Sequence, residues 1–186
     1  IWARDNQTVA TIANGMMSSG SGGPLVVGIA GPSGCGKTTL ARGLAERLQA
    51  PLISEDPAHF LLPHVPYSIR DARYEAPTNV NWESTRAAAD SLITGSEDGK
   101  VVIVEHYLLL AEASSLLPLL HCCLLMDPTS AGALSEEEAR QTCRERRVAR
   151  GERSPEEAEH LRKYYDEIVW PFYKEHTLAR AHALAG

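Results

Sequence analysis

Short apolar runs alternate with amphipathic stretches along most of the chain. Residues 25–30 (LVVGIA) and 101–104 (VVIV) are apolar at almost every position, which is typical of parallel strands that are buried on both faces. Residues 40–49 and 82–94 carry the helix-forming patterns that follow and precede these runs. Strands that alternate with helices predict an α/β domain with a doubly wound parallel sheet, and residues 101–104 are expected at its centre.

Weaker signals predict the remaining elements. Residues 52–54 read as a short strand and residues 119–126 as a further apolar run. Ser135 is followed by three glutamates, a good start for a helix because the serine caps its first turn and the acids complement its dipole. Two more helices are expected at residues 155–165 and 172–183.

Two segments lack a sustained apolar period. Residues 1–23 end in the small, polar sequence MMSSGSGG, which predicts a flexible N-terminal arm before a folded domain of residues 24–186. Residues 56–78 form an irregular, proline-containing connection. A connection of this length in a small domain is usually a functional loop.

Composition narrows the function classes. The chain has 186 residues, 18 Lys and Arg against 24 Asp and Glu, and a formal charge of −6, which argues against a nucleic-acid surface as the main partner. No run of about 18 apolar residues is present, so no membrane span is expected. The four cysteines form no C-x-x-C pair and no zinc spacing, which predicts reduced thiols in a cytoplasmic protein.

The most specific motif is GPSGCGKT at residues 31–38, between a predicted strand and a predicted helix. It has the P-loop pattern, in which glycines let backbone N–H groups turn toward phosphate oxygens. Lys37 is expected to reach the β- and γ-phosphates of ATP, and the Thr38 hydroxyl to bind Mg²⁺. The alternative is a glycine-rich turn before a helix. The predicted nucleotide-binding residues here are Gly31, Ser33, Gly34, Cys35, Gly36, Lys37, Thr38 and Thr39.

Two carboxylates follow predicted strands, at the sheet edge where open α/β sheets bind ligands. Asp56 either accepts the proton of a substrate hydroxyl, joins the Mg²⁺ shell, or caps a turn before Pro57. Glu105 stands where a Walker B acid would orient a metal-bound water or the substrate. Its alternative is a carboxylate that faces solvent.

A cluster of arginines follows Ser135. Residues 144–156 resemble a kinase lid that closes on phosphates, although arginines near a helix C-terminus also stabilise the helix dipole on a solvated face. The arginines are Arg140, Arg144, Arg146, Arg147, Arg150 and Arg153.

With these residues in place, the chain resembles the uridine kinase-like P-loop kinases, and most closely the nicotinamide riboside kinases. The resemblance implies a P-loop NTPase fold with helices on both faces of a parallel sheet ordered 2-3-1-4-5. No apolar strand follows residue 171, so the order 2-3-1-4 without the family's fifth strand is expected. The matching segments are GPSGCGKTT at 31–39, ISED at 53–56, YEAPTNVNWE at 74–83, VVIVEHYLL at 101–109, CRERRVAR at 143–150 and YYDEIVWPFY at 164–173.

The resemblance also assigns catalytic and ATP-binding roles. Asp56 would take the proton from a riboside 5′-hydroxyl and, with Thr38, contact Mg²⁺. Lys37 would hold ATP and act in catalysis. Arg146 and Arg150 match lid positions that contact ATP.

Further positions match the substrate site of the family. Arg147 would contact the ribose, and Glu75 stands where the family has an aspartate on the ribose hydroxyls. Tyr74 would stack on the base, with His59 or Phe60 on its opposite face. Glu105 is expected to contact the substrate or the metal ion because of its place at the end of a strand, apart from the resemblance.

The sequence therefore predicts an ATP- and Mg²⁺-dependent kinase that phosphorylates a small riboside. Nicotinamide riboside, which would give nicotinamide mononucleotide for NAD biosynthesis, is expected ahead of uridine or cytidine. A nucleotide-binding pseudokinase is the alternative from another class, because His106 stands where the family has glycine and because the fifth strand is missing. The sequence does not predict an oligomeric state.

Overall fold

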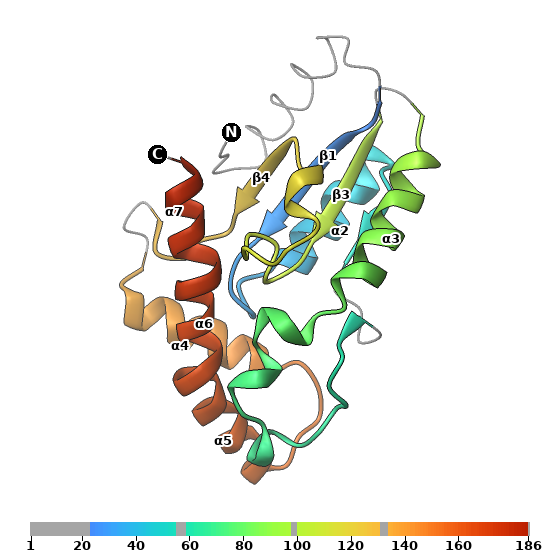
Figure 1. Cartoon of the computed structure of the whole chain (residues 1–186). Coiled ribbons are helices and arrows are strands. Elements are labelled where there is room, and N and C mark those ends of the chain that lie inside the picture. The colour runs from blue at the N-terminus through green and yellow to red at the C-terminus, as the bar shows by residue number, and fades with distance from the viewer. Residues whose placement is uncertain (1–22, 55–58, 98–99, 131–133, 186) are drawn as a thin grey trace.

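The computed structural model describes residues 23–54, 59–97, 100–130 and 134–185. In this part of the chain, four parallel strands form one sheet in the order β2-β3-β1-β4 (Figure 1). The predicted strand order and the central place of residues 101–104 are thereby confirmed. Residues 1–22 of the predicted arm lie outside the described residues, as does Asp56. The strands are β1 (Leu25–Ala30), β2 (Leu52–Ile53), β3 (Val101–Glu105) and β4 (Cys122–Leu125).

Helices cover both faces of the sheet. Alternate residues of β1 point to opposite faces, so Val27 and Ile29 pack with α2 (Lys37–Leu48), whereas Val26 packs with the opposite layer. That second layer contains α3 (Trp82–Thr94) and α7 (Ala179–Ala185). A strand buried on both faces has no polar side, which explains why β1 and β3 are apolar almost throughout.

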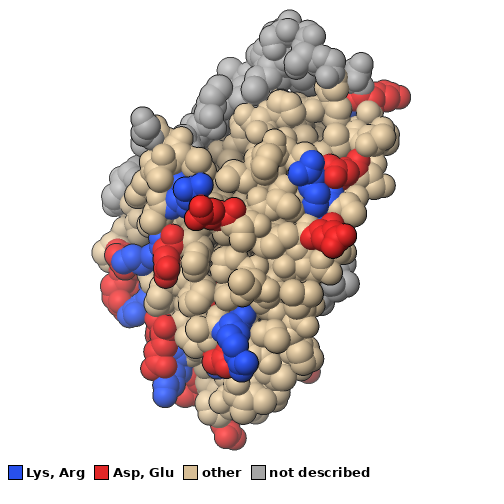
Figure 2. Space-filling view, viewed as in Figure 1, with Lys and Arg blue, Asp and Glu red and all other residues tan. Residues whose placement is uncertain are grey.

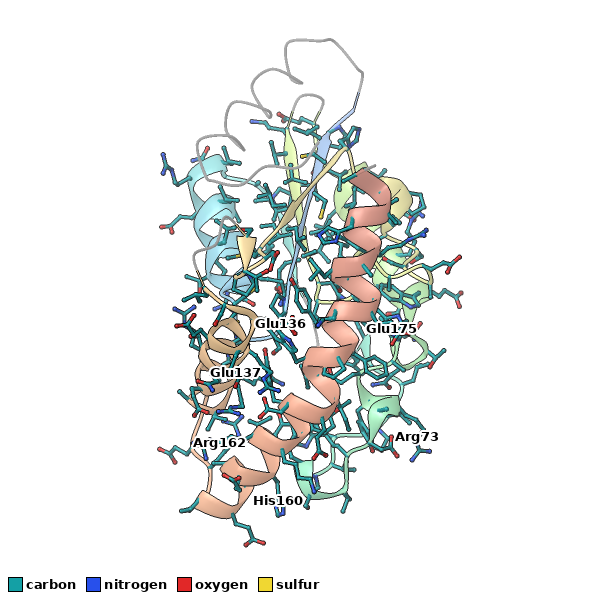
Figure 3. The ribbon with its side chains drawn as sticks, turned by 90° about the vertical axis from the view of Figure 1, so that its left-hand side faces the viewer. Arg73, Glu136, Glu137, His160, Arg162 and Glu175 are labelled. Carbon is teal, nitrogen blue, oxygen red and sulfur yellow. The ribbon has the colours of Figure 1, made fainter. Side chains whose placement is uncertain are left out.

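The C-terminal part of the chain forms one unbroken helical run instead of the two helices predicted at residues 155–165 and 172–183. Figure 3 shows it along the length of the domain. It consists of α5 (Pro155–Tyr164), α6 (Trp170–Tyr173) and α7, which are joined by wider π-type turns at Tyr165–Val169 and Lys174–Leu178. The first π-type turn ends just before Trp170-Pro171. It accommodates a proline that cannot donate a backbone hydrogen bond, so the prediction of a break was wrong.

Helix α4 (Glu136–Val148) begins as expected after Ser135. The Ser135 hydroxyl accepts a hydrogen bond from the Glu138 backbone N–H, and the Glu138 carboxylate accepts one from the Ser135 N–H. This reciprocal capping satisfies two backbone donors at the helix start. The helix packs against α5 beside the P-loop.

The long connection between β2 and α3 is folded against the helices. Its described part contains three short 3₁₀ turns, Tyr67–Ile69, Ala72–Tyr74 and Pro77–Asn79, of which the first packs against α5. The Asn79 side chain joins two parts of the connection, since its oxygen accepts from the Leu62 N–H at 2.8 Å and its nitrogen donates to the Tyr74 carbonyl at 3.0 Å. This segment therefore forms an ordered wall beside the helices.

Charged side chains of both signs are interspersed on the face shown in Figure 2, where acidic and basic groups lie near one another. Salt bridges account for several of the paired groups; Arg162, for example, lies 3.2 Å from Glu145. Across the described ranges, no helix is long and apolar enough to cross a bilayer.

Candidate functional site

The P-loop backbone adopts the conformation that its glycines permit. Gly31, Gly34 and Gly36 have φ angles of 149°, 90° and 103°, in the region that side chains with a Cβ rarely adopt. Gly34 is also tightly packed, because a Cβ on it would lie 2.0 Å from the Cys143 carbonyl oxygen in α4. The Tyr165 hydroxyl donates to the Ser33 carbonyl at 2.6 Å. Contacts with helix α4 and with the C-terminal helical run thus fix the position of the P-loop.

Lys37, Thr38 and Glu105 meet at the start of α2. Lys37 is 5% exposed, and its ammonium donates to the Pro32 carbonyl at 3.1 Å and lies 3.9 Å from Glu105 Oε1. The Thr38 hydroxyl donates to Glu105 Oε2 at 3.3 Å. Glu105 is only 3% exposed, so the alternative of a carboxylate facing solvent is wrong. The Glu105 carboxylate thus lies beside Lys37, the predicted phosphate ligand, and Thr38, the predicted Mg²⁺ ligand.

These residues suit a magnesium nucleotide. Backbone N–H groups at a helix start attract phosphate, and Lys37 adds a positive charge there. Thr38 and Glu105 would hold Mg²⁺, which prefers oxygen ligands and keeps several waters. Within the described ranges, no group of three or more His, Cys, Asp or Glu side chains could hold a metal ion by itself. A magnesium ion shared with nucleotide phosphates needs no such group.

A pocket of about 320 Å³ opens beside the P-loop. It brings together four of the predicted substrate residues, Phe60, Tyr74, Glu75 and Arg147, but its lining does not include His59. Glu105 is likewise absent from the lining and is buried against Thr38. The residues that line it are Ser33, Phe60, Leu62, Pro63, His64, Tyr67, Arg70, Tyr74, Glu75, Asn79, Tyr107, Arg147, Leu161, Tyr164 and Val169.

Two tyrosines orient the charged groups of the pocket. The Tyr164 hydroxyl donates to Glu75 Oε1 at 2.9 Å, and Arg147 Nη2 donates to the Tyr67 hydroxyl at 3.3 Å. Burial, followed by the negative charge of Glu75, raises the pKa of Tyr164 above its ordinary value, which keeps this phenol a proton donor. Tyr67 was not predicted as a site residue, and Tyr164 was only part of a matching segment, because these residues come together solely through the packing of α5 on the loop.

The arginine cluster divides into two groups. Arg140 and Arg144 form salt bridges with Asp166, and Arg153 donates to the Val148 carbonyl, so these three stabilise the helices. Arg146 and Arg150 are exposed and form no salt bridge within the described part of the chain. Their role as ATP-binding lid residues stays a prediction.

His106, the residue after the end of β3, is almost completely buried. Its ring stacks on Tyr107, with 5.0 Å between centroids, and its Nδ1 accepts from the Leu108 N–H at 3.1 Å. Burial, helped by the positive charge of Lys37 and by His59, lowers the pKa of His106 to about 3. The imidazole is therefore neutral in the folded protein and packs as an aromatic ring.

This buried imidazole predicts a loss of stability in acid. Unfolded His106 binds a proton below its ordinary pKa of 6.5, whereas the folded side chain does so only near 3, so the free energy of unfolding falls as the pH falls between these values. Between pH 7 and pH 5, the wild type should lose about 2 kcal/mol more than His106→Asn, as measured by urea unfolding. His160→Asn, on the partly exposed surface of α5, should keep the wild-type loss (Figure 3). Equal losses in the wild type and His106→Asn would contradict this interpretation.

Comparisons with known proteins match the part of the chain that contains the P-loop. A family model described as "ATPase family associated with various cellular activities (AAA)" matches residues 27–105, from β1 through Glu105. Among solved structures, the chain is similar to a protein of Silicibacter sp. TM1040 named "putative fructose transport system kinase". That likeness has a TM-score of 0.57 and 15% identity, and it covers 89% of this chain and 92% of the other. The chain thus has a P-loop NTPase-type fold, as the sequence predicted.

Proposed function

We propose that the chain is a small-molecule kinase that transfers the γ-phosphate of ATP to the 5′-hydroxyl of a riboside. The observation that carries this proposal is the position of Ser33, which belongs to the P-loop and also lines the 320 Å³ pocket. A molecule in that pocket lies directly beside bound phosphates. Pockets of this size, with aromatic walls and a few polar groups, suit small-molecule ligands.

Nicotinamide riboside is the candidate that the sequence resemblance puts first, with uridine and cytidine as alternatives. Glu75 can accept hydrogen bonds from a pair of ribose hydroxyls, and the rings of Phe60 and Tyr74 provide apolar faces for a base. Arg147 lies at the same pocket wall, where it contacts Tyr67. These groups support a riboside, whereas the choice among ribosides rests on the resemblance.

In the proposed reaction, the acceptor 5′-oxygen forms a bond to the γ-phosphorus while the bond from that phosphorus to the ADP oxygen breaks. When bound, Mg²⁺ would neutralise part of the negative charge of the phosphates. Lys37 stabilises the negative charge on the transferring group, and Thr38 and Glu105 would hold the Mg²⁺. Asp56 is the proposed base that takes the hydroxyl proton.

Asp56→Asn tests the proposed base. An amide of the same size cannot accept the hydroxyl proton, so kcat should fall about 100-fold, while the Kd for ATP should change less than about threefold. Steady-state ADP release and equilibrium binding measure the two quantities. Asp90→Asn, which removes a partly exposed carboxylate paired with Arg86 on α3, should change neither. A folded Asp56→Asn variant with near-native kcat would remove this assignment.

A nucleotide-binding protein without turnover is the second candidate. It is favoured by His106, a buried ring at a position where the resemblance implies glycine and close enough to Lys37 for the lysine charge to lower its pKa. ATP binding without acceptor-dependent ADP release would support it. Against this candidate, the Lys37 ammonium and the Glu105 carboxylate, which a kinase needs to bind phosphate and metal, are both present and in contact at the P-loop.

A further inference from the structure

Arg70 lines the pocket from the connection between β2 and α3, and three contacts hold its guanidinium in place. The guanidinium carbon lies 4.3 Å from the centroid of the Tyr67 ring and 5.5 Å from that of Tyr74. The Arg70 Nε donates to the Val65 carbonyl at 2.9 Å. Stacking on aromatic rings is a favourable arrangement for an arginine. The group is therefore preorganised at the pocket wall.

The charge of Arg70 is not neutralised by its described surroundings. Within the described ranges, Arg70 forms no salt bridge, and its hydrogen bond through Nε leaves the two terminal nitrogens without a described acceptor. Among the residues that the structure describes, the pocket lining contributes two guanidinium groups, of Arg70 and Arg147, and one carboxylate, of Glu75. A half-buried cation between aromatic rings attracts an anionic ligand and repels a cationic one.

We infer that Arg70 binds a carboxylate on the acceptor, so that the pocket prefers a carboxylate-bearing riboside to a neutral one and a neutral one to a cationic one. A carboxylate matches the planar guanidinium fork and can accept from both terminal nitrogens. The carboxylate takes no part in phosphate transfer. This inference rests on the proposed function and changes its order of candidates, because the nicotinamide riboside ring carries a positive charge.

Arg70 also restricts how a base can lie against Tyr74. Because the guanidinium lies 5.5 Å from the Tyr74 ring, the stacking predicted from the sequence requires the part of the ring that Arg70 leaves open. A base that stacks there has its edge near the guanidinium. A carboxylate on that edge comes within reach of Arg70, whereas a positive ring at the same place meets repulsion.

Equilibrium binding to the full chain tests the inference without turnover. Orotidine and uridine share the ribose and the pyrimidine and differ by one carboxylate; nicotinic acid riboside and nicotinamide riboside differ by a carboxylate in place of a carboxamide. Calorimetric titration should give about 10- to 100-fold tighter binding for the carboxylate member of at least one pair. A preference in neither pair, or no binding by any of the four, would overturn the inference.

Two arginine variants test whether Arg70 causes the carboxylate preference. Arg70→Gln should reduce the preference to less than about threefold. Arg73→Gln should preserve it, because Arg73 lies outside the pocket lining, pairs with Asp71 and points to solvent (Figure 3). An unchanged preference in folded Arg70→Gln would contradict the assignment of Arg70.

ADP release with the same four compounds separates this inference from the proposed function. A carboxylate preference in binding that Arg70→Gln removes, without ADP release for any acceptor, supports the anion site and contradicts the kinase. Release with uridine or nicotinamide riboside, without any carboxylate preference, supports the kinase and contradicts the inference.

Discussion

Lys37→Ala is expected to lower kcat for riboside-dependent ADP release by about 10²–10³-fold. The Lys37 ammonium is almost completely buried at the start of α2, where the Pro32 carbonyl and the Glu105 carboxylate fix its position. A preorganised cation at this place stabilises the charge on a transferring phosphate without having to reorganise water around it. Alanine removes both the charge and its fixed position.

The measurement is steady-state ADP release at saturating ATP and acceptor. Lys100→Ala is the matched control. Lys100 is exposed and precedes the first residue of β3, at the end of the strand opposite to Glu105, so its removal should leave kcat unchanged. A thermal unfolding curve for each variant establishes that it is folded. Folded Lys37→Ala with unchanged turnover would remove the P-loop from the mechanism.

Gly34→Ala is expected to destabilise the protein by about 2–5 kcal/mol and to weaken ATP binding. Two costs combine at this position. The φ angle of 90° is unfavourable for alanine, and the added Cβ would lie 2.0 Å from the Cys143 carbonyl oxygen. A backbone oxygen cannot rotate away as a side chain can, so either the P-loop or α4 must move.

Gly43→Ala gives the matched control. Gly43 lies in α2 with open space where a Cβ would be, so alanine should keep or raise stability by up to about 1 kcal/mol. Urea unfolding of both variants measures the difference, and ATP titration measures binding. If Gly34→Ala were as stable as Gly43→Ala and bound ATP equally well, the packing of the P-loop on α4 described above would be incorrect.

The sheet could be predicted from the sequence because its signals are local. The apolar runs of β1 and β3 and the P-loop pattern between β1 and α2 specify two neighbouring strands and a helix start within short segments. Glu105 was correctly predicted at a strand end. Its burial against Lys37 and Thr38, however, depends on how the start of α2 packs against the end of β3. The continuous helix through Pro171 depends on a π-type turn that has no sequence signature.

The substrate pocket was only partly predictable. Phe60, Tyr74, Glu75 and Arg147 were predicted and lie together in its wall, whereas Arg70 was not predicted. Neither charge nor spacing distinguishes Arg70 from Arg73, which lies three residues later and faces solvent. The packing of the loop turns one of these arginines onto the rings of Tyr67 and Tyr74, and pairs the other with an acid.

The most direct test of the kinase is ADP release from ATP–Mg²⁺ over a panel of nicotinamide riboside, uridine, cytidine and orotidine. Reactions without acceptor and reactions with Lys37→Ala serve as blanks. We predict acceptor-dependent release, with one riboside clearly preferred and with almost none in the variant. A folded chain that binds ATP but releases no ADP in response to any of these ribosides would contradict the account.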